Sequence, residues 1–298
     1  MRSEASPSRI ETARVAEGLL RVKLASGKGM LKIVLEKKDD DANCVYLEIS
    51  GVRNFEAGND CDTCHFWFKC LREPRLGGSK KIMNLPKTIQ MPRPVDETLI
   101  REIAPLFDLF DKGEYYVFET SINLTGPYGS EDEGSYFFSD EFQELWDISD
   151  PAEEDLLSGW EHFEGERPRV YRHGEGNFVE KQFDFVVPLV RQSTLSEEYV
   201  KLYRSMIAEG DRPRILLLGM YQRGIPEKVR RNQARVMHSF FAGFVLDGHH
   251  KLAAYRRSRV PAKFLVILAQ KASKYHLRKD ETAPARTQFE ERLTTLVG

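Results

Sequence analysis

The sequence predicts an α+β protein, with a mainly antiparallel β domain at its N-terminal end and a compact α/β domain at its C-terminal end. Near the N-terminus, apolar and polar residues alternate at 31–35 and 45–49, which is the pattern of half-buried strands. Near the C-terminus, residues 215–220 and 264–269 are apolar throughout, as in strands covered on both faces. The length of 298 residues suits about two domains, and 41% hydrophobic residues can build a core.

We expect three parts along the chain: residues 1–125 as the β domain, 126–180 as an acidic linker or insertion, and 181–298 as the α/β domain. Pro105 lies within an otherwise helical pattern and is expected to kink it. The elements expected in the first part are a polar tail at 1–14, an antiparallel meander of strands at 18–24, 30–35 and 44–52, a helix at 95–110 and a strand at 115–124.

In the C-terminal part, strand and helix patterns alternate. Ser196 and the two glutamates after it form a helix start, and Gly210 ends that helix. The elements expected here are a strand at 183–190, a helix at 194–209, a strand at 214–221, a basic helix at 226–240, a strand at 241–246, a helix at 251–257, a strand at 264–269 and a final helix at 286–296.

The net charge of −2 conceals a strong asymmetry along the chain. Residues 167–298 hold 25 Lys and Arg against 13 Asp and Glu, whereas residues 1–166 hold 19 against 33. Residues 129–166 alone contain 14 acidic side chains and no Lys or Arg. Either this stretch is a solvated acidic segment, or the basic half binds an anion such as a nucleotide while the acidic half shields it from nucleic acid.

The most informative motif is Asp247-Gly248-His249-His250-Lys251, which stands between an apolar strand and a helix. The first N–H groups of a helix have no partner within it, and the helix dipole is positive there, so this end attracts phosphate or carboxylate. Gly248 allows the backbone to approach a ligand closely. A bound anion would account for Lys251, whose charge opposes the dipole. In the alternative interpretation, Asp247 only caps the helix and the histidines are surface or core residues.

Residues 247–254 resemble the motif of the ParB/sulfiredoxin-like superfamily, whose members place an Asp-Gly-(His/Asn)-His-Arg element at a helix start. The resemblance covers the motif and its flanking strands, which is less than a quarter of the chain. It implies a ParB/sulfiredoxin-like α/β domain in which Gly248, His250 and Lys251 bind nucleotide phosphates. It also implies ATP or another nucleoside triphosphate, with Mg²⁺, as the cofactor. Lys251 stands where many members have Arg, and Lys binds phosphate as a point charge.

The superfamily includes ATP-dependent sulfiredoxins, free-serine kinases, segregation proteins and some nucleases. Sulfiredoxin chemistry is disfavoured because His249 stands where those enzymes have Cys. The role of the segregation proteins is disfavoured because only a short polar segment follows where they have a DNA-reading domain. The resemblance then implies ATP-dependent phosphate transfer to a small molecule, or nucleotide hydrolysis, with Asp247, His249 and His250 as catalytic residues. The alternative is a non-catalytic module that senses a nucleotide or holds a protein partner. Direct nucleic-acid binding ranks third.

Three of the four cysteines, Cys61, Cys64 and Cys70, lie within ten residues. The Cys-x-x-Cys pair can supply two zinc ligands and Cys70 a third, which would make zinc a structural cofactor. A redox pair is a second interpretation. In a third, the cysteines act as small hydrophobes on the buried face of a short helix. The sequence leaves all three open.

Several classes of protein lose support. The longest apolar runs are far shorter than the roughly 20 residues of a membrane span, the N-terminus has no apolar signal region, and four cysteines do not form a disulfide scaffold. There is no Walker loop, no Gly-x-Ser-x-Gly and no His-Glu-x-x-His. We therefore expect a cytoplasmic protein without membrane contact. Its expected partners are a nucleotide and a small-molecule substrate, and a protein partner or homodimer stays open.

Overall fold

The computed structural model describes residues 10–37, 43–60, 65–72, 92–122, 124, 169–172, 178–190, 194–224, 235–275 and 284–297. These residues form an α+β fold that contains a large mixed sheet and a small antiparallel sheet, as expected in class. None of the helices in this part of the chain has both the length and the apolar character needed to cross a bilayer.

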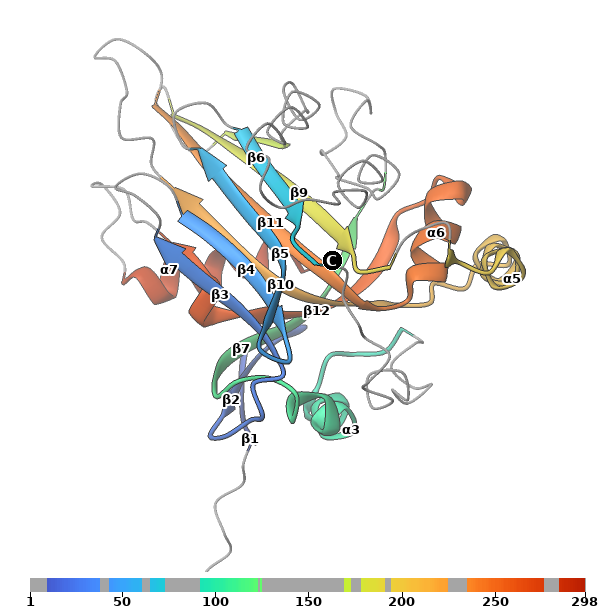
Figure 1. Ribbon diagram of the computed structural model, residues 1–298, viewed down its shortest axis with the longest axis horizontal. Coiled ribbons are helices and arrows are strands. Elements are labelled where there is room, and N and C mark those ends of the chain that lie inside the picture. The colour runs from blue at the N-terminus through green and yellow to red at the C-terminus, as the bar shows by residue number, and fades with distance from the viewer. Residues whose placement is uncertain are drawn as a thin grey trace, which may run out of the picture.

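The large sheet has nine strands and contains segments from both ends of the chain (Figure 1). Its neighbours are mostly antiparallel, but β10 runs parallel to β12 and to the short β13, and β9 runs parallel to β11. The strands in spatial order are β1 (Ile10–Ala16), β2 (Leu19–Leu24), β7 (Gly113–Ile122), β12 (Ala262–Ala269), β10 (Ile215–Gly224), β11 (Arg235–Asp247), β9 (Phe178–Pro188) and β8 (Arg169–Arg172), with β13 (Lys274–Tyr275) beside β10.

The small sheet is an antiparallel meander that lies across one face of the large sheet, as Figure 1 shows. Its strands are β3 (Leu31–Lys37), β4 (Asn43–Ile49), β5 (Val52–Asp60) and β6 (His65–Cys70). The remaining elements are the helices α3 (Glu97–Phe107), α5 (Glu197–Ala208), α6 (His249–Ser258) and α7 (Ala285–Thr294), and the 3₁₀ turn η4 (Gln270–Ala272).

The central strands are buried on both faces, which explains their continuous apolar sequences. On β10, Leu216 and Leu218 join the core cluster that also contains residues of the small sheet and of α3. Ile215 and Leu217 join the opposite cluster, which contains residues of α5, α6 and α7. The molecule therefore has three layers, namely the small sheet with α3, the large sheet, and the other helices.

The strand directions bring several chain segments to one edge of the large sheet. Because β9 and β11 are parallel and β10 is antiparallel to β11, the first two strands end at the edge where β10 and β12 begin. Helices α5 and α6 pack together at this edge (Figure 1). The residues of the Asp247–Lys251 motif therefore lie where four strands and two helices meet.

The expected boundaries between 1–125 and 181–298 do not separate the two sheets. Strand β7, from the first segment, is the direct antiparallel neighbour of β12 from the second, with Val117 opposite Ile267. The connection from β2 to β3 carries the chain from the large sheet to the small one. Gly27 lies in this connection, next to the residues that follow α3. An added Cβ at this position would be 1.9 Å from the carbonyl oxygen of Phe110, so only glycine fits.

Two of the expected elements are wrong in part. The polar tail was expected to reach residue 14, but Ile10–Ala16 form the edge strand β1, because pairing with β2 satisfies its backbone without a strongly apolar sequence. The basic helix expected at 226–240 does not include residues 235–240, which belong to β11. Pairing with β9 on one side and β10 on the other overrides the local pattern there. Residues 225–234 lie outside the described residues.

Helix α3 confirms the helix expected around Pro105 and provides a first prediction. Asp96 caps its N-terminus by accepting a hydrogen bond from the Leu99 N–H at 2.8 Å.

Pro105 is exposed, so its ring contributes little packing, and it cannot donate a hydrogen bond within the helix. We expect Pro105→Ala to raise the free energy of unfolding by about 1 kcal/mol, measured by urea denaturation, after the greater freedom of the unfolded chain is included. A loss of stability would show that the ring supports the turn after the helix.

Candidate functional site

The motif begins where β11 ends. Gly248 has a φ of 99°, in the left-handed region, and it links Asp247 at the end of the strand to His249 at the start of α6. An added Cβ at this position would also lie 3.3 Å from the Cα of Ile215 in β10. Glycine is therefore required here both by the backbone conformation and by the close approach of β10.

The two histidines bind two different segments of the chain. The His249 Nε2 accepts a hydrogen bond at 3.0 Å from the backbone N–H of Leu189, which follows β9. The His250 Nε2 accepts one at 3.1 Å from the backbone N–H of Ser196, the residue that precedes α5. Because an N–H group can only donate, both Nε2 atoms are unprotonated, and the proton of each neutral ring is on Nδ1.

Both rings are held in the neutral form. Burial and, to a smaller extent, the neighbouring His250 together lower the pKa of His249 to about 3. Burial also lowers the pKa of His250, although the charge of Asp247 opposes that shift. Near pH 7 the motif therefore carries one cation, on Lys251, and the histidines act there as hydrogen-bond acceptors.

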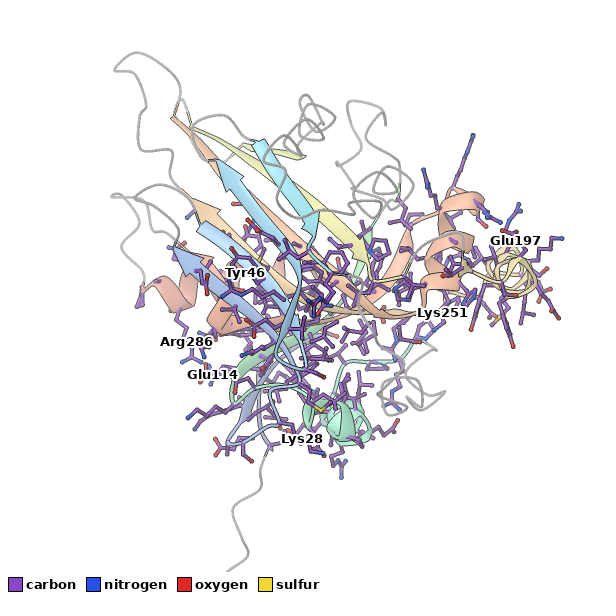
Figure 2. The ribbon with its side chains drawn as sticks, viewed as in Figure 1. Lys28, Tyr46, Glu114, Glu197, Lys251 and Arg286 are labelled. Carbon is purple, nitrogen blue, oxygen red and sulfur yellow. The ribbon has the colours of Figure 1, made fainter. Side chains whose placement is uncertain are left out.

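Lys251 points into the protein. Its side chain is 2% exposed, and its Nζ donates to the backbone carbonyl of Arg214 at 3.0 Å. The same Nζ lies 3.5 Å from a carboxylate oxygen of Asp247 and 5.8 Å from the ring centre of Tyr203 on α5. Burial lowers the pKa of Lys251, and the charge of Asp247 opposes this. Figure 2 labels Lys251 on α6 and Glu197 on the neighbouring α5.

The three side chains that the sequence associated with a bound anion thus each have a partner within the protein. His249 binds the end of β9, His250 binds the start of α5, and Lys251 binds the residue before β10. A fourth contact comes from the buried Tyr255, whose hydroxyl donates to the carbonyl of Pro213 at 3.1 Å. Consecutive residues of α6 therefore join the segments that meet at this edge of the sheet.

Sequence reasoning missed a buried arginine beneath the motif. The Arg214 side chain is fully buried, and its Nη1 donates to the carbonyl of Arg93 at 3.2 Å and to Glu119 at 3.3 Å. Lys263 lies 3.5 Å from the same glutamate. Because Lys251 binds the Arg214 carbonyl, this network is continuous with the motif. An arginine directly before an apolar strand was the one available signal for it.

Helix α5 completes the site from the other side. The rings of Tyr199 and His250 meet edge to face with their centres 5.4 Å apart. Arg257, near the end of α6, forms a bidentate ion pair with Glu197 at 2.6 and 2.7 Å. The first turn of α5 is thus attached to both ends of α6. Sequence reasoning identified the helix but not these contacts.

The arrangement leaves one group of donors at the motif itself. The N–H of Leu252 donates to the Gly248 carbonyl at 2.8 Å, which is the first hydrogen bond of α6, so the N–H groups of the three preceding residues have no partner within the helix. The N-cap residue of α6 is Gly248, which has no side chain to cap this end. Asp247 stands beside it with 34% of its side chain exposed. An anion at these N–H groups would meet the positive end of the helix dipole and one neighbouring carboxylate.

The predicted zinc ligands lie almost wholly outside the described residues. Residues 61–64 are outside them, and Cys70 is described only as a backbone position in β6. Residues 65–70 form a strand, so the interpretation in which they belong to a short helix is wrong. In the part of the chain that the structure describes, no three His, Cys, Asp or Glu side chains gather as metal ligands would. Zinc binding stays a prediction.

Comparison of the chain with protein-family models, with curated proteins and with solved structures found no match.

Proposed function

We propose that this chain is a nucleotide-binding protein of the ParB/sulfiredoxin-like kind that holds the phosphates at the N-terminus of α6. The observation that carries the proposal is the uncapped first turn of a ten-residue helix, entered through a left-handed glycine at a crowded sheet edge. Three adjacent backbone N–H groups and the helix dipole favour a phosphate there. The contacts would come from the backbone at His249, His250 and Lys251, because their side chains have protein partners.

Binding without turnover is the form of this function that the geometry favours. General acid–base catalysis near neutral pH needs a group that can gain and lose a proton in that range. The Nε2 atoms of His249 and His250 accept backbone hydrogen bonds, and burial lowers the pKa of both rings. Protonating either ring would cost the hydrogen bond that holds Leu189 or Ser196. A nucleotide sensor, which the sequence offered as the alternative, uses the turn without this cost.

A magnesium ion fits the proposal only as a companion of the phosphates. Mg²⁺ is commonly held by one or two carboxylates together with substrate phosphates. Asp247 supplies one partly exposed carboxylate beside the first turn of α6, and part of it faces the Lys251 ammonium. Bound Mg²⁺ would offset the repulsion between this carboxylate and a phosphate. We therefore expect nucleotide affinity to depend on Mg²⁺ and on Asp247.

A matched pair of variants at position 250 tests the site. Gln and Glu are nearly equal in size, and each has a side-chain oxygen that can accept the Ser196 N–H in place of Nε2. Glu alone adds a negative charge to the first turn of α6, where a phosphate would bind. By calorimetric titration with ATP, CTP and GTP in Mg²⁺, we expect His250→Gln to bind as the wild type does. We expect His250→Glu to bind at least about tenfold more weakly, since one like charge at close range costs about 1.4 kcal/mol or more.

Equal affinity of the two variants for the nucleotide would show that its phosphates do not bind at the N-terminus of α6. No binding of any nucleotide to the wild-type chain would overturn the proposal altogether.

The second candidate function is ATP-dependent phosphate transfer or hydrolysis, and the exposed part of Asp247 favours it, since a carboxylate can position water or metal. Release of inorganic phosphate by the wild type and its loss in Asp247→Asn would support that candidate over simple binding.

A further inference from the structure

A basic hollow lies between α5 and the end of α6. Its volume is about 720 Å³, and it is open to solvent. Lys201 and Arg204 line it from α5, Arg212 from the segment after α5, and Arg257 from the end of α6. Ser205 and Ser258 add two neutral donors, and among the residues that the structure describes no carboxylate side chain lines the hollow. Four cations with no lining anion produce a local field that a phosphate would neutralise.

Two of the four cations are held in place by other contacts. Arg257 is fixed by its bidentate ion pair with Glu197. The Nη1 of Arg212 donates to the carbonyls of Ile207 and Asp211, both at 2.9 Å. These contacts orient the two guanidinium groups before any ligand arrives, so less side-chain freedom is lost on binding.

Glu197 is a carboxylate near the hollow, and three of the four lining cations act on it. Its bidentate pair with Arg257 lowers its pKa most, and the charges of Lys201 and Arg204 lower it further. One carboxylate thus faces three cations at the rim of the hollow.

We propose that this hollow binds the sugar-phosphate backbone of a nucleic-acid strand without reading its bases. Pockets for single small ligands are enclosed and mostly apolar, and they often contain aromatic side chains. This hollow is open, and the described residues that line it are four cations, two serines and three aliphatic residues. Repeating phosphates suit a row of cations, and such contacts carry no sequence information. From the sequence, nucleic-acid binding ranks third because a DNA-reading domain is absent and the N-terminal half is acidic. Contacts to the backbone need no base-reading domain, and this surface belongs to the basic half.

The test is fluorescence anisotropy with a labelled oligothymidylate of about 20 nucleotides, at salt concentrations between about 50 and 200 mM. The test variant is Lys201→Gln/Arg204→Gln. The control, Lys23→Gln/Arg101→Gln, removes the same charge from exposed residues on β2 and α3. Each phosphate contact on a single strand changes the slope of log K against log salt by about 0.7. The test variant should therefore lose about 1.4 from the slope and bind about 25-fold more weakly at 0.1 M salt, with the control unchanged.

Three results would overturn the proposal. The first is no binding of the oligonucleotide to the wild type at the lowest salt. The second is an equal loss in the control variant, which would assign the effect to net charge rather than to the hollow. The third is displacement of the oligonucleotide by micromolar pyrophosphate, which would make the hollow a site for a small phosphate ligand. These results test the hollow alone, because the residues described as lining it come from the end of α6 and not from its first turn.

Discussion

Replacing Lys251 with alanine should lower the free energy of unfolding by about 4 kcal/mol. The side chain is 2% exposed, so its removal opens a cavity whose cost is about 2 kcal/mol or more. The change also leaves the Arg214 carbonyl without its donor inside the protein, which costs a further 1–3 kcal/mol, in round terms about 2. Urea unfolding monitored by circular dichroism measures the effect, and in a chain of this size Tm should fall by roughly 10 °C.

Two further variants separate the contributions of the charge and of the alkyl stem. Lys251→Met keeps most of the stem but removes the ammonium, so we expect it to cost about 2 kcal/mol, the part due to the unpaired carbonyl. Lys201→Ala removes an exposed lysine from α5 and should change stability by less than about 0.5 kcal/mol. If Lys251→Met were as stable as the wild type, the ammonium would contribute nothing net to this edge of the sheet.

Acidification should destabilise the protein through His249. Its pKa in the folded chain is about 3, whereas a histidine in an unfolded chain titrates near 6.5. Between these values the unfolded chain binds a proton that the folded chain does not, so stability is fully present above pH 6.5 and falls as the pH decreases below it. One such group contributes a slope of about 1.4 kcal/mol per pH unit, which amounts to about 3 kcal/mol between pH 7 and pH 4.5. The lowered pKa of His250 acts in the same direction.

The variant His249→Gln isolates this contribution from that of all other titrating groups. Its amide oxygen can accept the Leu189 N–H as Nε2 does, but it does not titrate. Urea unfolding at pH 7, 5.5 and 4.5 should therefore show that the free energy of unfolding falls less steeply with decreasing pH in the variant than in the wild type. The difference in slope should correspond to the uptake of about one proton on unfolding. Parallel curves for the two proteins would mean that His249 gains its proton without breaking its bond to the end of β9.

Both predictions bear on the proposed binding site, because the same residues provide its backbone. His249 fixes the residue after β9, and Lys251 fixes the residue before β10. The three N–H groups of the first turn of α6 are thus positioned by contacts that do not involve a ligand. A rigid turn of this kind is ready to bind a phosphate without further ordering.

Local features of the sequence were sufficient to predict an element where its pattern of apolar residues directly reflects which faces are buried. The apolar run on β10 indicated a strand buried on both faces, and its residues divide between the two core clusters as that pattern requires. Ser196 marked the start of α5, and the left-handed Gly210 follows its end. The turn at Gly248 and the start of α6 were also evident from the sequence.

The same signals were insufficient where pairing between distant strands decides the outcome. Residues 235–240 carry a basic pattern that favoured a helix, yet they form β11 because two neighbouring strands take up their backbone hydrogen bonds. Likewise β1 and β2 are close in sequence to β3 to β6, but they belong to the large sheet, whereas β3 to β6 form the small one. No periodicity within one segment specifies which distant segment will lie beside it.

The sequence by itself determined the α+β class, the central strands and the strand–glycine–helix unit that contains Asp247 and Lys251. Only the tertiary structure decided what the polar residues of that unit contact. The histidines and the lysine were assigned to an anion because they are adjacent to a helix start, but each binds a different chain segment. The basic hollow likewise joins residues 45 or more positions apart, Arg257 with Arg212 and the α5 cations. Periodicity depends on which face of an element is buried, whereas the partner of a polar side chain depends on which strand ends meet at one edge of the sheet.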